Sequence, residues 1–116
     1  MPYAKEEREF FDPAELGEWE QVAGYPEGIR QRVLSADPES GDHTRLLSFP
    51  AGVETQERLA HDFWEEVYII EGSFFDLTLG KTFSAGDYAI RPPGMRHGPW
   101  RTDEGVTTFE SRYYSR

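Results

Sequence analysis

Residues 61–72 read HDFWEEVYIIEG, and residues 86–97 read GDYAIRPPGMRH. In the first stretch, the apolar run from Val67 to Ile70 is rich in β-branched side chains and predicts a short strand. In the second, Pro92-Pro93-Gly94 predicts a tight turn, because proline fixes φ and glycine accepts positive φ. Both stretches therefore pair a predicted strand with a histidine near its end.

The sequence outside these stretches also consists of short predicted strands between turn residues. Pro, Gly, Asp and Ser are concentrated in the separators, as in ADPESGD and SAGD, and neither an internal repeat nor a sustained helical period is present. Short strands at this spacing predict an all-β sandwich or small barrel, and eight strands enclose room for one small ligand. The predicted strands are Ile29–Ser35, Thr44–Phe49, Glu66–Glu71, Ser73–Leu79, Lys81–Phe83, Tyr88–Ile90, Gly98–Arg101 and Thr107–Tyr114.

The length of 116 residues predicts one domain. Residues 1–25 are the least strand-like part, so we expect a short N-terminal extension that packs on a barrel made by residues 26–116. Within the extension, Asp12 and Pro13 predict the start of a helical turn. The charged N-terminus lacks the apolar segment of a secretory signal, and we expect a cytoplasmic protein.

The charge balance restricts the classes of partner. Lys plus Arg is 12 and Asp plus Glu is 22, which gives a net charge of 12 − 22 = −10. Such a surface repels the phosphates of nucleic acids and of anionic membranes, so neither is an expected partner. The longest apolar run is also far too short to span a membrane.

The chain contains three histidines, His43, His61 and His97, and no cysteine. Any metal would therefore be held by imidazole and carboxylate, a donor set that favours Fe, Mn, Ni, Co or catalytic Zn. His61 and Glu65 are four residues apart, so a turn or bulge between them would place both on one wall. His43 follows Gly41-Asp42 and is expected to be an exposed turn residue. Spacing alone is equally consistent with histidines that make only ordinary hydrogen bonds.

Together, the two opening stretches resemble the paired motifs of the cupin superfamily. Gly52, His61, Glu65 and Gly72 follow the first motif, and Gly86, Pro92, Gly94 and His97 follow the second. The resemblance covers about residues 44–114 and looks like single-domain cupins related to anti-sigma-factor cupin domains and acetylacetone-dioxygenase-like proteins. It implies a jelly-roll barrel (double-stranded β-helix), a divalent metal ion (Fe²⁺, Zn²⁺, Mn²⁺ or Ni²⁺) held by His61, Glu65 and His97, and a homodimer.

The sequence departs from the first motif at Leu59, where these cupins carry a further histidine. Two interpretations follow. The site is retained as a two-His-one-carboxylate triad with more open positions, the set used by non-haem Fe(II) oxygenases. Alternatively, metal affinity has fallen and the barrel serves binding or a metal-free reaction. We favour retention, because the other three ligand positions are intact.

The predicted function is a metal-dependent enzyme, dioxygenase-like or lyase/isomerase-like, that acts on a small oxygen-bearing substrate such as a diketone, an enol or a carboxylate. Glu110 is the candidate base and Arg101 the candidate anion-binding residue, although each has a plainer interpretation as a surface residue, Arg101 in a salt bridge. A non-catalytic sensor of a metal or small molecule, and a metal-free structural or lectin-like barrel, are the alternatives. The predicted substrate pocket includes Leu59, Phe63 and Trp100.

Overall fold

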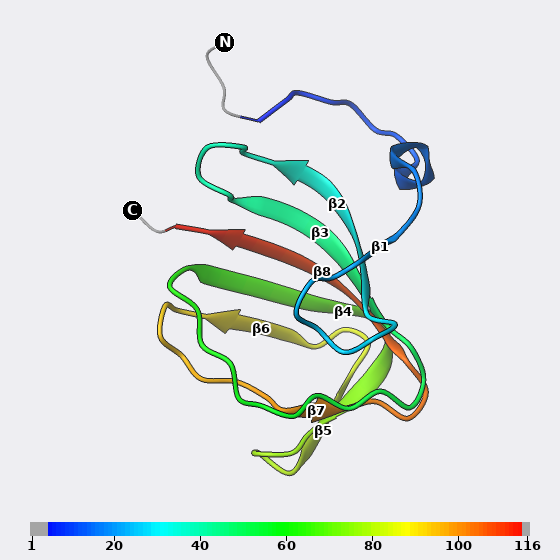
Figure 1. Ribbon diagram of the computed structural model, residues 1–116, viewed down its shortest axis with the longest axis vertical. Coiled ribbons are helices and arrows are strands. Elements are labelled where there is room, and N and C mark those ends of the chain that lie inside the picture. Colours follow the sequence, from blue (N-terminus) through cyan, green and yellow to red (C-terminus); the bar gives the residue numbers. More distant parts are fainter. Residues whose placement is uncertain (1–4, 115–116) are drawn as a thin grey trace.

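A computed structural model describes residues 5–114, and nearly all of its regular structure is β-strand (Figure 1). The predicted all-β class is confirmed. The structure has eight strands, but two predicted strands (Glu66–Glu71 and Ser73–Leu79) form one, and the strand Glu20–Gln21 lies in the segment predicted to be an extension. The elements are a 3₁₀-helical turn η1 (Pro13–Leu16) and strands β1 (Glu20–Gln21), β2 (Arg30–Ala36), β3 (His43–Phe49), β4 (Trp64–Asp76), β5 (Lys81–Ser84), β6 (Tyr88–Arg91), β7 (Trp100–Arg101) and β8 (Val106–Tyr113).

All strand pairs are antiparallel, and β4 connects two layers. The main path runs β1-β2-β3-β8-β4-β5, and β6 and β7 also pair with β4. The first half of β4 pairs with β8 and β6, whereas Ser73–Asp76 pairs with β5 and β7. Figure 1 shows β4 passing from the large layer toward β5 and β7, so this single long strand closes one side of the barrel.

The prediction of two strands with a turn at Glu71-Gly72 is wrong, because β4 continues through this point. The register with β8 shifts between Ile69 and Glu71, and Gly72 has φ of 81°. A Cβ at Gly72 would lie 2.1 Å from the backbone oxygen of Gly105. The glycine therefore lets the strand bend from one layer into the other while β8 packs directly against it.

The N-terminal segment adds to the large layer. Asp12 caps η1 by accepting a hydrogen bond from the backbone of Ala14, with Pro13 in the first helical position, which confirms the predicted helical turn. β1 pairs with β2, and Val22 is buried against Ile29 and Leu47. The boundary at residue 25 stays a prediction, and residues 1–4 and 115–116 lie outside the described part of the chain.

The space between the layers holds polar side chains as well as apolar ones. Leu47, Val67, Ile69 and Val106 are buried, as alternation along their strands requires. Within residues 5–114, seven residues with polar or charged side chains are also buried: Arg45, Glu65, Asp76, His97, Thr102, Thr108 and Glu110. Because buried polar groups are retained only with partners or a role, these residues define where to look for function. Within residues 5–114, no helix is long and apolar enough to span a membrane.

Candidate metal centre

Three predicted ligands come together at one end of the barrel. One nitrogen each of His61 and His97 and one carboxylate oxygen of Glu65 lie within 4.8 Å of one another. Glu65 is the second residue of β4, His61 precedes that strand, and His97 lies between β6 and β7. The bulge or turn expected between His61 and Glu65 corresponds to the bend Asp62-Phe63 just before β4.

Backbone hydrogen bonds join the two loops that carry the histidines. Leu59 and His97 exchange both of theirs, with N···O distances of 2.8 Å and 2.9 Å. The N–H of Gly94 donates to the carbonyl of His61 at 2.7 Å. The Pro-Pro-Gly turn therefore fixes His97 and holds His61 in place at the same time. Leu59 contributes its backbone to this arrangement and no ligand atom.

Aromatic rings fix the orientation of both imidazoles. His61 stacks on Phe63 with ring centroids 4.6 Å apart and planes 8° apart, and His97 stacks on Trp100 at 5.4 Å and 28°. The Nδ1 atom of His97 lies 3.3 Å from the carbonyl oxygen of Met95. That contact places the ring proton on Nδ1 and leaves the Nε2 lone pair, which faces Glu65 at 3.9 Å, free to bind a cation.

The electrostatics of the site keep the histidines uncharged. Burial, followed by the positive charge of Arg91, lowers the pKa of His97 to about 4, although the Glu65 carboxylate acts in the opposite direction. Burial also lowers the pKa of His61. Both imidazoles are therefore neutral at physiological pH, which is the state that binds a metal ion.

This donor set fits a divalent metal ion. Two neutral imidazoles and a carboxylate form the two-His-one-carboxylate combination, and the position of Leu59 supplies no fourth ligand. Arg91 donates from Nη1 to Oε1 of Glu65 at 2.7 Å, so one carboxylate oxygen already faces a cation. Oε2, the second oxygen, makes neither of these contacts and is available to a metal ion.

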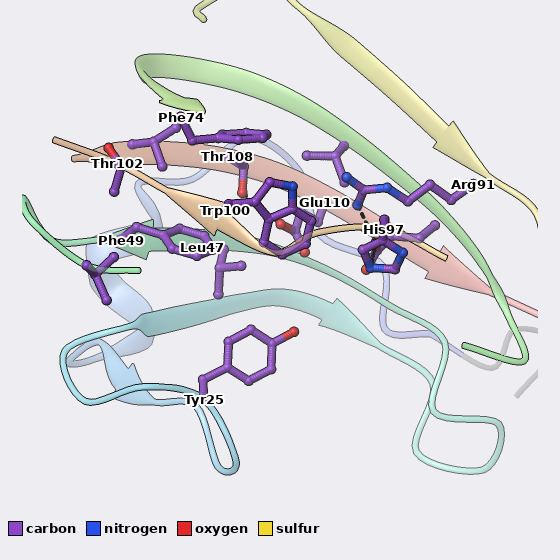
Figure 2. A pocket seen from close by; sticks show the side chains of 14 residues that line it. Tyr25, Leu47, Phe49, Phe74, Arg91, His97, Trp100, Thr102, Thr108 and Glu110 are labelled. Atoms are coloured by element: carbon purple, nitrogen blue, oxygen red, sulfur yellow. Dashed lines mark hydrogen bonds and ion pairs between the residues drawn. The ribbon is translucent and has the colours of Figure 1, made fainter. Parts of the chain in front are cut away.

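Two of the candidate ligands, Glu65 and His97, line an interior cavity with a volume of about 30 Å³, whereas His61 does not line it (Figure 2). This volume holds one or two water molecules, and the walls are mostly apolar. Glu65, His97 and Trp100 line it, so one of the three predicted pocket residues is in place. Phe63 and Leu59 are not lining residues of this cavity. Phe63 packs behind His61 instead, and the aromatic walls exclude bulk water from the charged groups.

A second polar cluster lies on the strands beside Glu65, since β8 pairs with β4 and β3 pairs with β8. Arg45 on β3 pairs with Glu110 on β8 at 3.1 Å, and Thr108 donates a hydrogen bond to the same carboxylate at 2.8 Å. Burial raises the pKa of Glu110, although the charge of Arg45 opposes this shift. Tyr25 also lines the cavity, from the loop between β1 and β2, and burial raises its pKa. The cavity thus has an acid-base group, Glu110, in the same lining as the candidate ligands Glu65 and His97.

The other predicted residues have different surroundings. Arg101 is 43% exposed at its side chain and lies 3.5 Å from Asp103, and it does not line the cavity. Its catalytic role stays a prediction, and the geometry favours the surface salt bridge. His43 is the first residue of β3 and is half-buried, with Nδ1 3.0 Å from the carbonyl oxygen of Gly41, so it is not an exposed turn residue.

Sequence reasoning missed Arg91, Arg45 and Tyr25. The alternation on β6, where Ala89 and Arg91 face inward, was the available signal for Arg91. Arg45 alternates with Leu47 in the same way on β3. A charged residue at an inward position of a short strand was therefore the pattern to follow.

Comparisons with known proteins agree with this fold. The family model described as the ChrR Cupin-like domain matches residues 7–114. A search of curated proteins finds no match. An RmlC-like cupin from Shewanella frigidimarina has a similar structure, with a TM-score of 0.73 and 24% identity over 98% of this chain and 96% of that chain.

Two further structures are similar. An acetylacetone dioxygenase from Acinetobacter johnsonii has a TM-score of 0.61 and 20% identity, over 96% of this chain and 79% of that one. The anti-sigma factor ChrR of Rhodobacter sphaeroides, solved in complex with SigE, has a TM-score of 0.61 and 24% identity, over 83% of this chain and 49% of that one. At these identities the likenesses establish the jelly-roll fold.

Proposed function

Because this chain belongs to the ChrR Cupin-like domain family, we propose that it is a metal-dependent enzyme acting on a small oxygen-bearing substrate, such as a diketone, an enol or a carboxylate. The convergence of His61, Glu65 and His97, two of which line an interior cavity, carries the proposal. A divalent ion held there (Fe²⁺, Zn²⁺, Mn²⁺ or Ni²⁺) would polarise substrate oxygens, and a redox-active ion would add dioxygenase-type chemistry.

The chain itself supplies positioning, dryness and a proton acceptor. Trp100 and Phe63 hold the two imidazoles in place, and the apolar wall keeps bulk water away from the reacting atoms. Glu110 faces the same cavity with a raised pKa, which suits a group that takes a proton from carbon or oxygen and returns it. Arg45 and Thr108 fix that carboxylate from behind.

Metal content tests the proposal directly. Protein purified without added metal is expected to contain about one ion per chain by elemental analysis, because all three ligand positions are intact. His97→Ala should fold and lose the ion, whereas His43→Ala, which removes a histidine outside the cluster, should keep it. Substoichiometric metal, together with a melting temperature that chelation leaves unchanged, would contradict a metal-dependent enzyme.

Turnover separates the reaction classes. Metal-loaded protein is incubated with a panel of β-diketones and hydroxyaryl ketones, in air and without oxygen. Turnover only in air supports dioxygenase chemistry, and equal turnover in both supports a lyase or isomerase. Glu110→Gln should lower turnover at unchanged metal content if that carboxylate acts as the base.

The second candidate function is a non-catalytic sensor module. The similarity to ChrR, an anti-sigma factor solved with its sigma factor, favours it, although this chain spans about half of that protein. A sensor would bind the ion without turning over any substrate in the panel. It would also change its stability or its oligomeric state on loading.

A homodimer belongs to the same proposal, as does a cytoplasmic location for this cysteine-free, acidic chain. On the outer face of the large layer, Tyr68 pairs across strands with Tyr88 and with Phe109. These side chains are 47%, 55% and 41% exposed, and they form an apolar row that a second copy would cover. Sedimentation equilibrium should give a dimer for the wild type, and Tyr68→Glu should give a monomer with an unchanged fold.

A further inference from the structure

A larger pocket lies directly beside the interior cavity. Its volume is about 300 Å³, which is in the range of small-molecule sites. Arg91, His97 and Trp100 line both the pocket and the cavity, so they form a shared wall between them. Figure 2 shows Arg91 extending from β6 to His97 at one end of the inner cavity. A molecule in the outer pocket would therefore contact a candidate metal ligand and Arg91 together.

The outer pocket carries positive charge on a strongly acidic protein. Arg58, Arg91 and Arg96 line it, in a chain with 12 basic and 22 acidic residues. Two acids also line it, so its formal charge is 3 − 2 = +1, against −10 for the whole chain. Both carboxylates are already engaged, because Asp76 accepts hydrogen bonds from two backbone N–H groups and Asp87 accepts one.

Two arginines of this pocket, Arg58 and Arg96, differ from most others in the fold. Within residues 5–114, neither makes an ion pair, so their guanidinium groups can bind an added anion. Most arginines outside the pocket are matched with acids or aromatic rings: Arg8 with Glu15, Arg45 with Glu110, Arg101 with Asp103, Arg32 with Trp19 and Arg112 with Phe63.

Arg91 is held in a position from which it can bind a second partner. Its guanidinium lies 5.4 Å from the centroid of Trp100, and Nη1 donates to Glu65. A guanidinium has five N–H donors, and the contact with Glu65 uses one of its nitrogens. The planar fork of the remaining donors matches the two oxygens of a carboxylate.

We propose that the outer pocket binds a carboxylate group of the substrate, with Arg91 as the inner anchor and Arg58 and Arg96 at the rim. This inference rests on the proposed function, because it places the rest of the substrate at His61, Glu65 and His97. It specifies the substrate class as a small oxo acid, in which a carboxylate sits next to the keto or enol oxygens. Arg91 is a substrate-binding residue in this arrangement.

Two matched compounds test the proposal. Acetylpyruvate is acetylacetone with one methyl group replaced by a carboxylate, so the pair differs in the anionic group alone. Their dissociation constants are measured by calorimetry on zinc-loaded and on metal-free protein, and zinc affinity is measured separately by chelator competition. The variants are Arg91→Gln and the double variant Arg58→Gln/Arg96→Gln. Arg30→Gln, at an exposed position at the start of β2, is the control.

The expected result is that acetylpyruvate binds more tightly than acetylacetone. Arg91→Gln should weaken acetylpyruvate binding about tenfold, as expected for a lost hydrogen bond between charged groups. The double variant Arg58→Gln/Arg96→Gln should weaken acetylpyruvate binding about fivefold. Its dissociation constant for acetylpyruvate should also depend less on salt concentration than that of the wild type. Acetylacetone binding and the zinc affinity of the rim variant should change less than about twofold, as should every constant of Arg30→Gln.

In protein that binds zinc, two results would overturn the inference. One is that the arginine variants weaken the binding of acetylacetone as much as that of acetylpyruvate, and the other is that Arg30→Gln weakens acetylpyruvate binding as much as they do. Tighter binding of inorganic phosphate than of acetylpyruvate would also overturn it, because the anion would then be a phosphate. If zinc does not bind, the proposed function fails. The calorimetry on metal-free protein still tests the inference in that case. Arg58→Gln/Arg96→Gln must weaken acetylpyruvate binding to the metal-free protein, and unchanged binding would overturn the inference.

Discussion

Gly72→Ala should be strongly destabilising, because the residue combines a positive φ with a close approach of another strand. Its φ is 81°, and a Cβ would lie 2.1 Å from the backbone oxygen of Gly105 and 2.8 Å from the Cα of Val106. A left-handed conformation costs an alanine about 1–2 kcal/mol. Pushing the backbone of β8 away by roughly an ångström adds about 1–3 kcal/mol, as overpacking does elsewhere. The expected loss in the free energy of unfolding is therefore about 2–5 kcal/mol.

Gly52→Ala is the matched control. Gly52 has φ of 84°, almost the same as Gly72, but a Cβ there meets nothing within 4 Å. Its cost should be the conformational part alone, about 1–2 kcal/mol. Urea unfolding followed by far-UV circular dichroism measures both variants, and with an m-value of about 1–2 kcal/mol/M the midpoints should differ by roughly 0.5–3 M. Equal midpoints for the two variants would refute the contact between β4 and the turn before β8.

Three further predictions concern the charged interior. Glu65→Gln should release the metal and lower the stability of the metal-free protein by about 2 kcal/mol, measured by urea unfolding, because Arg91 loses its charged partner. Because the pKa of His97 is lowered to about 4, its imidazole stays neutral through pH 6.5. The stability of the metal-free protein should therefore fall between pH 6.5 and about 4, where the unfolded state binds the extra proton, and thermal melts across this range that stay level would contradict this. Glu110→Ala should cost about 3–5 kcal/mol by leaving Arg45 buried without its partner, whereas Arg45→Met/Glu110→Leu should recover most of that loss in the same assay.

The fold was predictable to the level of class. The strand list omits β1 and divides β4 in two, and this division has a physical origin. The sequence predicts a turn at Glu71-Gly72, because glycine readily adopts the positive φ that is typical of turns. The same conformation serves a bend within a continuous strand when another strand packs against it, as Gly105 does here. Local sequence does not distinguish the two cases, since the difference lies in the partner strand.

The candidate ligands were predictable because their positions are local properties of two motifs. His61 and Glu65 share one short segment, and the turn Pro92-Pro93-Gly94 delivers His97. The hydrogen bonds that join the two loops confirm that these segments meet. The surroundings were less predictable, because Glu110 had been expected more readily at the surface, and the structure buries it against Arg45.

The sequence by itself determined the all-β class, most of the strands and the three residues that meet at the candidate metal centre, because alternation, turn residues and motif spacing act over short stretches of chain. Only the tertiary structure decided which charged groups surround them. Arg91 meets Glu65 across 26 residues of chain, and Arg45 meets Glu110 across 65, because the register of paired strands brings them opposite each other. That register is set by the packing of whole strands, so residues near in sequence do not reveal it. The two arginines, absent from the sequence-based site, now define its walls.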